Sequence, residues 1–365
     1  DQSFPMVLQE QSRSIPKSGQ NCGIGILVNP RAARDVRRLV TGASSVPVSE
    51  RIAICYRIVR GLSALDIGQI LMMPDRDNIA MKLKTAVERD RSSTSAKLPE
   101  IRILDMRVTD SAQDTLEAVQ LMVKAKVGAI MVLGGDGTHR LVAHACGKIP
   151  LVCISTGTNN AFPGNPEATI AGLAAGAVGR SLVTPDLVCH SNKRLCVRVN
   201  SQDTIPALVD VCITTETQTG TRALWRSNRL RKLFLTFAEP GQVGLSSIGS
   251  LLSPTTREDD NGLAIDIDPT AEEFKKLMAP IAPGLFEPVM ITNYRPILIN
   301  QKCVIDSSAG TLAYDGEREV TLFTGDRVEI TLDRRGPRTI DVAKTIENIA
   351  YSGLLISDHA LLSNR

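Results

Sequence analysis

The sequence predicts a two-part α/β protein: an N-terminal domain with a Rossmann-like parallel sheet, then a β-rich sandwich domain, and a C-terminal helix that returns to the first domain. Three observations predict this. The chain has 365 residues, too many for one ordinary domain. Apolar runs alternate with helical patterns up to about residue 155, and from about residue 180 the pattern becomes one of alternating strands.

The first 155 residues repeat a strand–helix order. We expect strands at 23–28, 67–73, 101–104, 127–133 and 150–154, and helices from 31 to 40, at 49–60, 75–89 and 111–125, from 139, and from 166 with residue 165 as its cap. Repeated strand–helix–strand units give a parallel sheet, and such sheets bind ligands at the carboxyl ends of their strands.

The second part reads as strands. Residues 195–199 and 209–213 alternate, and 320–322 and 328–332 flank a segment, 323–327, that predicts a hairpin.

A helical pattern returns with Val342, Ile346 and Ile349 on one face, and these residues need a partner surface. The predicted domains are therefore 22–165, with 336–365 docking back on it, and 175–333.

Composition excludes several classes of protein. A net charge of +3, with one Trp, four Tyr and seven Phe, argues against binding to nucleic acid. No apolar run approaches the roughly 18–20 residues that span a bilayer. The eight cysteines form no Cys-x-x-Cys pair, so we expect buried reduced thiols rather than zinc or disulfides. Residues 1–21 lack the apolar core of a signal peptide, and we expect a cytoplasmic protein.

The strongest chemical signal is the string Gly134-Gly135-Asp136-Gly137-Thr138, which follows a buried strand and precedes a helix. Glycines let backbone N–H groups approach a ligand, and amides at a helix N-terminus favour phosphate. Asp136 cannot attract phosphate, so its use is to hold Mg²⁺ or to accept a proton from an attacking hydroxyl. The alternative, a tight turn capped by an aspartate, is disfavoured by the full string.

The next strand is followed by a second loop, STGTNNAFP at 155–163. Its hydroxyls and carboxamides can bind phosphate, ribose or base edges, although such a loop alone is weak evidence. Its candidate binding residues are Thr156, Gly157, Thr158, Asn159 and Asn160. Two loops of this kind at one sheet edge strengthen the prediction of a nucleotide site.

These motifs together resemble a known superfamily. GGDGT, the STGTNNAF loop, and a β-rich half that ends in DGE and GDRVEI are similar to NAD kinases and diacylglycerol/sphingosine-type lipid kinases, over roughly residues 23–350. The GILVNP…DVRRLV opening and the ALVDV…TRALW stretch resemble the acetoin-catabolism X (AcoX) branch, described as ATP-NAD kinase-like.

The resemblance implies phosphorylation of a hydroxyl with Mg²⁺, with ATP or polyphosphate as donor. In NAD kinases that hydroxyl is the adenosine ribose 2′-OH. The resemblance assigns Asp136 either to organising the phosphates and the metal or to the role of the base. It matches Asn29 to the Asn of the family's Asn-Pro. Asp315 and Glu317 occupy the DGE positions, which supply the base in the lipid kinases.

Two positions depart from the NAD kinase pattern. Glu317 stands where NAD kinases more often carry glutamine. Val209-Asp210 stands for the Asn-Glu pair that holds the dinucleotide, so the acid is kept and the amide is lost. Ser246 and Ser247 fall in a segment, GLSSIGSLL, that replaces the family's Thr/Gly/Ser substrate segment.

The sequence thus predicts a kinase with its site between the two domains. The loops hold ATP phosphates, Asp210 selects the acceptor, with Asp315, Ser246 and Ser247 beside it, and Asp136 or Glu317 takes the hydroxyl proton. NAD⁺ is the first acceptor considered, which would place the chain in NADP biosynthesis. There are two alternatives. One is a kinase of the same superfamily that acts on a lipid or other hydroxyl, and the other is a nucleotide-binding sensor of acetoin catabolism without turnover. No nucleic-acid or membrane partner is expected, and a homo-oligomer is left open.

Overall fold

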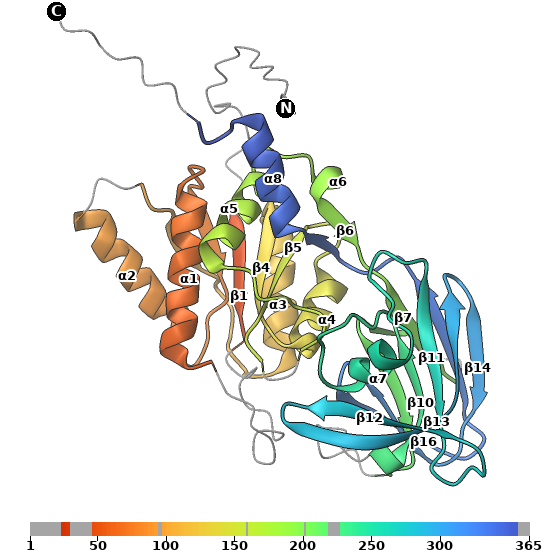
Figure 1. Cartoon of the computed structure of the whole chain (residues 1–365). Coiled ribbons are helices and arrows are strands. Elements are labelled where there is room, and N and C mark those ends of the chain that lie inside the picture. The colour runs from red at the N-terminus through yellow and green to blue at the C-terminus, as the bar shows by residue number, and fades with distance from the viewer. Residues whose placement is uncertain are drawn as a thin grey trace, which may run out of the picture.

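The computed structural model describes residues 23–29, 46–93, 97–157, 160–200, 202–217 and 227–356, with the backbone alone at 317–319. It consists of an α/β half and a half built from two largely antiparallel sheets (Figure 1). This architecture confirms the predicted fold class. The helix expected at 31–40 lies outside the described residues.

A seven-stranded sheet forms the middle layer of the first half, in the order β3-β2-β1-β4-β5-β18-β6. Its strands are β1 (Ile24–Val28), β2 (Gln69–Met72), β3 (Glu100–Ile103), β4 (Ala129–Gly134), β5 (Leu151–Ser155), β6 (Cys189–Ser191) and β18 (Arg338–Ile340). All neighbouring strands are parallel except β18 and β6. The carboxyl ends of β1, β4 and β5 therefore lie side by side at one edge of the sheet.

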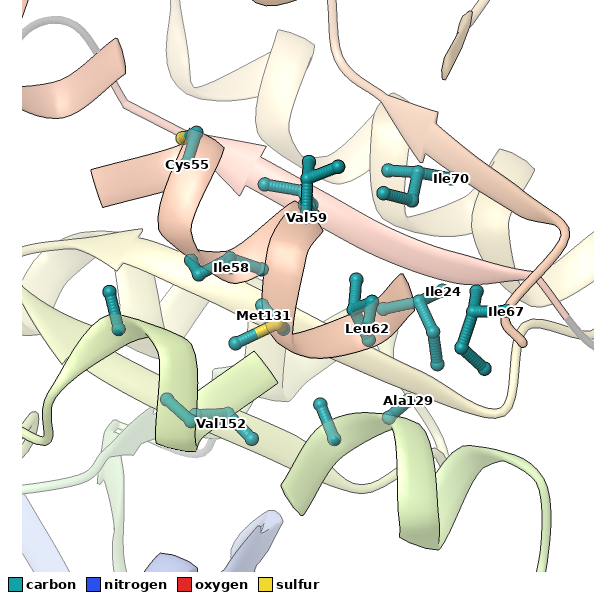
Figure 2. Packing of buried hydrophobic residues seen from close by; sticks show 14 of the residues in the cluster. Ile24, Cys55, Ile58, Val59, Leu62, Ile67, Ile70, Ala129, Met131 and Val152 are labelled. Carbon is teal, nitrogen blue, oxygen red and sulfur yellow. The ribbon is translucent and has the colours of Figure 1, made fainter. Parts of the chain in front are cut away.

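Helices cover both faces of this sheet. They are α1 (Val48–Ser63), α2 (Ile79–Ser93), α3 (Ala112–Lys124), α4 (Asp136–Ala145), α5 (Ala168–Gly179), α6 (Pro185–Val188) and α8 (Val342–Ser352). On one face Ile24 of β1 packs in a cluster with Ile58 of α1 (Figure 2). On the other face Leu27 of β1 packs with Val119 of α3. Burial on both faces explains why these strands read as unbroken apolar runs.

Helix α5 begins two residues later than predicted. The expected cap was Asn165 with Pro166 as first helical residue, but the helix starts at Ala168. The carboxylate of Glu167 accepts the N–H of Ile170 at 3.0 Å and so acts as the cap. A carboxylate in this position satisfies an N–H group that has no partner within the helix.

Helices α1 and α5 cross at glycines. A Cβ on Gly172 would lie 2.4 Å from the carbonyl oxygen of Ile58, whereas one on Gly176 would meet only side-chain atoms, the nearest 3.3 Å away. We therefore expect Gly172→Ala to lower the free energy of unfolding by about 1–3 kcal/mol, through overpacking against a backbone atom that cannot move aside. Gly176→Ala, in the same helix, is the control and should change stability far less. Urea denaturation of both variants measures this, and equal midpoints would contradict it.

The second half is a sandwich of two sheets, as predicted. The larger has the order β12-β13-β11-β10-β9-β15-β16, and the smaller β14-β17-β7-β8. The strands are β7 (Arg194–Val199), β8 (Ile205–Ala207), β9 (Asp210–Thr214), β10 (Leu230–Leu235), β11 (Asn261–Ile267), β12 (Lys275–Ala282), β13 (Leu285–Leu298), β14 (Lys302–Asp306), β15 (Gly310–Tyr314), β16 (Glu317–Leu322) and β17 (Arg327–Asp333). Val211 and Leu312 of the larger sheet pack against Val197 and Ile330 of the smaller one. Helix α7 (Leu245–Leu252) covers the other face of the larger sheet through Ile248.

The hairpin predicted around 323–327 is wrong. Strands β16 and β17 do not pair, because β16 pairs with β15 in the larger sheet and β17 pairs with β14 and β7 in the smaller one. The segment between them carries the chain from one sheet to the other. The hairpin lies one turn earlier, at Asp315 and Gly316, whose φ angles of 49° and 78° match the two-residue turns that join antiparallel strands.

Residues 338–352, near the C-terminus, join the first half. Thr339 of β18 pairs with Leu151 of β5, and Ile340 and Ile349 are part of the core under α1 and α5. Asp341 caps α8 by accepting the N–H of Lys344 at 2.9 Å. The limits proposed for the two domains stay a prediction.

In the part of the chain that the structure describes, no helix has both the length and the apolar character needed to cross a bilayer.

Candidate functional site

Polar residues follow three adjacent strands of the first sheet. Asn29 comes directly after β1, the GGDGT string includes the end of β4, and the STGTNNAFP loop begins at the end of β5. In the strand order β3-β2-β1-β4-β5 the chain reverses direction across the sheet between β1 and β4. Such a switch point is where open α/β sheets bind ligands.

The first two of these segments contact each other. The Asn29 side-chain amide donates to the Thr138 hydroxyl at 2.7 Å, and the Asn29 N–H donates to the Leu133 carbonyl at 3.0 Å. A Cβ on Gly134 would lie 2.7 Å from the Cβ of Thr138, so only glycine fits there. The structure therefore brings together three of the residues predicted to bind phosphate.

The second and third segments interlock at Asn160. A Cβ on Gly135 would lie 2.9 Å from the Asn160 Oδ1 atom, and one on Gly157 would lie 2.7 Å from its Nδ2 atom. The Thr156 N–H donates to the Gly134 carbonyl at 3.2 Å. The GGDGT and STGTNNAFP segments, called the first and second glycine loops from here on, thus pack against each other as one unit. The predicted contacts Thr158 and Asn159 lie outside the described residues.

Asp136 joins the two loops. It is the first residue of α4, and its carboxylate accepts the N–H of Ala161 at 3.0 and 3.2 Å and that of Phe162 at 2.8 Å. A carboxylate at a helix N-terminus is favoured by the helix dipole. Asp136 therefore fixes the backbone of the second loop, a role that the sequence did not suggest, and Gly137 lies beside it in the first turn of α4.

His139 is a buried residue of this unit that sequence reasoning missed. Its ring Nδ1 lies 2.8 Å from the Gly135 carbonyl, and its ring centroid lies 6.0 Å from that of Phe162. Burial lowers the pKa of His139 to about 4, so the imidazole is neutral at pH 7. Its spacing of four residues from Gly135 was the only signal in the sequence, and any residue in a helix has such a neighbour.

Asp315 brings the second half of the chain to α4. Its carboxylate accepts the N–H of Leu208 at 3.0 Å and that of Val209 at 2.8 Å. The Arg140 Nε lies 3.5 Å from Asp315 Oδ2, and the Arg140 guanidinium stacks 4.5 Å above the Tyr314 ring. Burial raises the pKa of Asp315 to about 7, against the opposing effects of Arg140 and the backbone amides.

Asp210 lies beside this turn. Its carbonyl accepts the Asp315 N–H at 3.0 Å, and the residue is only 6% exposed, which excludes a solvent-facing strand position. Val211 packs in the sandwich core, as the predicted alternation requires. Val209 does not pack in the sandwich core. It precedes β9 and packs in an apolar cluster with Phe162 and Phe237. That cluster lies between the two halves of the chain.

The remaining predicted site residues are less informative. Ser247 is buried, and its hydroxyl donates to the carbonyls of Gly244 at 2.7 Å and Pro280 at 3.2 Å. Ser246 is also buried in α7. The backbone of Glu317 begins β16 opposite Tyr314. Their roles in binding and catalysis stay predictions.

Mg²⁺, which the resemblance implies, takes oxygen ligands from carboxylates and from substrate phosphates. Among the described residues, no three His, Cys, Asp or Glu side chains are grouped so that they could hold a metal ion. Asp136 and Asp315 already accept backbone N–H groups. These carboxylates do not fit a magnesium site built by the chain itself.

A charged loop of the second half, 255–261, reaches the second glycine loop. Its Arg257 donates to the carbonyls of Ala161 at 2.8 Å and Phe162 at 2.9 Å. In the sequence it stands in a run of mostly charged and polar residues, TTREDDN, with no motif beside it. The contacts of Arg257 with the second glycine loop were thus not predicted from the sequence.

Lys193 lies under this loop and is 2% exposed; its ammonium donates to the carbonyls of Thr256 at 2.8 Å and Asn261 at 2.5 Å. Burial lowers its pKa from 10.5 to about 8. Between about pH 8 and pH 10.5 the folded protein therefore binds fewer protons than the unfolded chain. The free energy of unfolding thus increases as the pH rises through this range. Methionine has no such titration. We therefore expect the free energy of unfolding of the wild type minus that of Lys193→Met to increase by a few kcal/mol from pH 8 to pH 10, since each unit of pKa shift corresponds to about 1.4 kcal/mol.

Urea denaturation at pH 8 and pH 10 checks the Lys193 prediction. A wild-type-minus-variant difference that is the same at both pH values would contradict it.

Comparison with known proteins gives matches to both halves. Residues 24–179 match the family model of the ATP-NAD kinase N-terminal domain, and residues 193–335 match that of the acetoin catabolism protein X C-terminal domain. Acetoin catabolism protein X of Cupriavidus necator is 38% identical over 338 residues, which cover 92% of this chain and 94% of the relative.

Two solved structures are similar at low sequence identity. Yeast NADH kinase complexed with NADH has a TM-score of 0.49 and 16% identity, over 94% of this chain and 91% of that chain. An NAD kinase from Archaeoglobus fulgidus in complex with ATP has a TM-score of 0.36 and 12% identity, over 80% of this chain and 99% of that chain.

Proposed function

The chain belongs to the acetoin catabolism protein X family, and from this premise we propose that it is a kinase that transfers the terminal phosphoryl group of ATP to a hydroxyl, with NAD⁺ as the first acceptor to test. Its N-terminal half matches the ATP-NAD kinase domain model. The product would be NADP⁺.

One observation carries this proposal. Three adjacent strands end in Asn29, the GGDGT string and the STGTNNAFP loop at the switch point of the sheet, and the two glycine loops pack against each other. The first turn of α4 follows directly, so its backbone N–H groups point toward the same place. Backbone amides of this kind bind phosphate.

The residues of the chain would divide the work as follows. The amides of 134–138 hold the phosphates, and Asp136 keeps the second loop in place. The bond between the γ-phosphorus and the β–γ bridging oxygen breaks, a bond from the acceptor hydroxyl forms, and ADP leaves. The hydroxyl proton goes to a carboxylate, Asp136 or Glu317. Mg²⁺ bound to ATP would supply neutralisation of phosphate charge, with no ligand assigned to this chain.

The test is an assay of purified protein with ATP and Mg²⁺. NAD⁺, NADH, diacylglycerol and small hydroxyl compounds are offered one by one, with polyphosphate as a second donor, and ADP and phosphorylated product are measured. Formation of NADP⁺ supports the proposal. ATP binding without product from any acceptor would instead favour a nucleotide-binding sensor.

A second acceptor class is favoured by Val209. Its side chain is 1% exposed and packs with Phe162 and Phe237, so it cannot take the place of the amide that holds the dinucleotide in NAD kinases. A smaller hydroxyl compound needs no such contact. The same assay separates the two, because this acceptor class predicts turnover with a small alcohol and none with NAD⁺.

We expect Asp210 to contribute to binding of the acceptor and not to binding of the donor, ATP. Its carboxylate is buried on a strand that borders the Asp315 turn, where it could accept hydrogen bonds from hydroxyls of the acceptor. We expect Asp210→Ala to raise the acceptor Kd by about tenfold or more, the effect of one hydrogen bond to a charged group. The Kd for ATP should stay nearly unchanged. Calorimetric titration measures both constants, and equal losses or none would remove Asp210 from the acceptor site.

A further inference from the structure

The peptide groups of Ala161 and Phe162 are held from two sides. Their N–H groups donate to Asp136, from the first half of the chain. Their carbonyls accept from the two terminal nitrogens of Arg257, from the second half, at 2.8 and 2.9 Å. The Gln242 side-chain amide adds a third contact, to the Ala161 carbonyl at 3.1 Å. The end of the second glycine loop is therefore fixed by both halves together.

Arg257 is itself held in a defined orientation. Its Nε lies 3.3 Å from both carboxylate oxygens of Glu239. Its guanidinium lies 4.2 Å from the centre of the Phe237 ring and 5.2 Å from that of Phe162. A planar guanidinium can meet two carbonyls, a carboxylate and two rings at once, whereas a lysine ammonium cannot.

The loop that carries Arg257 is anchored to the second half. Arg334 donates to the Arg257 carbonyl at 3.3 Å and to that of Asp259 at 2.9 Å. Lys193 holds the loop at Thr256 and Asn261. A shift of the second half would therefore move Arg257, and with it the carbonyls of Ala161 and Phe162.

We propose that Arg257 is a positioning residue that holds residues 160–163, the last part of the STGTNNAFP segment, in place for nucleotide binding. It ties the affinity for ATP to the placement of the acceptor-binding half of the chain. The proposal rests on the proposed function for the identity of the nucleotide. The contact itself, between Arg257 and the two carbonyls, is independent of that function.

The experiment compares Arg257→Gln, Arg257→Lys and a control, Arg338→Gln. Arg338 also forms an ion pair, with Asp186 at 2.6 Å, and its side chain is 31% exposed against 22% for Arg257. Two properties are measured: the Kd for ATP by calorimetry, and the hydrogen exchange of the Ala161 and Phe162 amides without nucleotide.

For Arg257→Gln we expect an ATP Kd raised by about 10- to 100-fold, as for loss of charged hydrogen bonds, and faster exchange at both amides. Arg257→Lys should give a smaller but distinct loss, because it keeps the charge without the paired donors. Guanidinium ion added to Arg257→Gln at low concentration should lower the Kd again. Arg338→Gln should match the wild type in both measurements.

Three results would overturn the proposal: an unchanged Kd and exchange rate in Arg257→Gln, full recovery in Arg257→Lys, or equal losses in the Arg338 control. If the wild type binds no ATP, the proposed function fails. The exchange measurement then still decides whether Arg257 holds the loop, and unchanged exchange in Arg257→Gln would refute it.

Discussion

Asp136→Asn should lower the rate of phosphoryl transfer by about two to four decades, the usual contribution of a positioned proton-transfer group. The physical reason includes the loop as well as the proton. An asparagine has one acceptor oxygen where the carboxylate has two, and its NH₂ group would face the N–H of Ala161 or Phe162. The variant therefore loses both a candidate base and the contact that aligns the second glycine loop.

The matched control for this variant is Asp114→Asn in α3. Asp114 is also an aspartate in the first turn of a helix that accepts backbone N–H groups, those of Thr109 at 3.0 Å and of Asp110 at 2.7 Å. Both variants lose acceptor capacity, but only Asp136 is near the glycine loops. Initial rates in the ADP assay measure the effect, and wild-type turnover in Asp136→Asn would exclude the assigned site.

Asp315→Ala should lower the free energy of unfolding by about 3–5 kcal/mol at pH 8, the usual cost of removing one partner of a buried ion pair. At that pH its carboxylate, with a pKa of about 7, is ionised. The variant leaves the N–H groups of Leu208 and Val209 buried without their acceptor and takes away the anion beside Arg140. These losses fall where the two halves of the chain meet.

Asp326→Ala serves as the comparison for Asp315. Asp326 also closes a turn, by accepting the N–H of Phe323 at 2.8 Å, but in exposed surroundings. Its loss should lower stability much less, because the exposed Phe323 N–H can then bond to water. Urea denaturation of both variants at pH 8 gives the two values. A loss for Asp315→Ala no larger than that for Asp326→Ala would show that the buried pair contributes little.

Local pattern predicted most of the first half. The strand at 24–28 and the GGDGT turn could be placed because a buried parallel strand reads as an apolar run and its end is marked by glycines. The strands at 317–322 and 327–333 were predicted in part, as 320–322 and 328–332, but their partners were not. An alternating pattern shows which face of a strand is buried and carries no information on which strand lies beside it.

Long-range polar contacts could not be predicted. Asp315 and Leu208 are separated by 107 positions, and Arg257 and Phe162 by 95. Each pair joins a side chain to a backbone group, and every residue has the same backbone groups. Asp136 was found as a candidate because its glycine neighbours mark the site. Arg257 lay among other charged residues, and no neighbouring residue marked it.

The returning strand β18 has a consequence for synthesis on the ribosome. Strand β5 is completed early, but its neighbour β18 and the β6–β18 pair require residues such as Thr339, which bonds to Asn192 from 147 positions away. Gly164 already bonds to the later part of β5, so until β18 emerges it is the start of the strand, at Leu151, that lacks its second neighbour. The half that is translated first is thus the last to be completed, because its sheet closes only after the strands of the second half have been made.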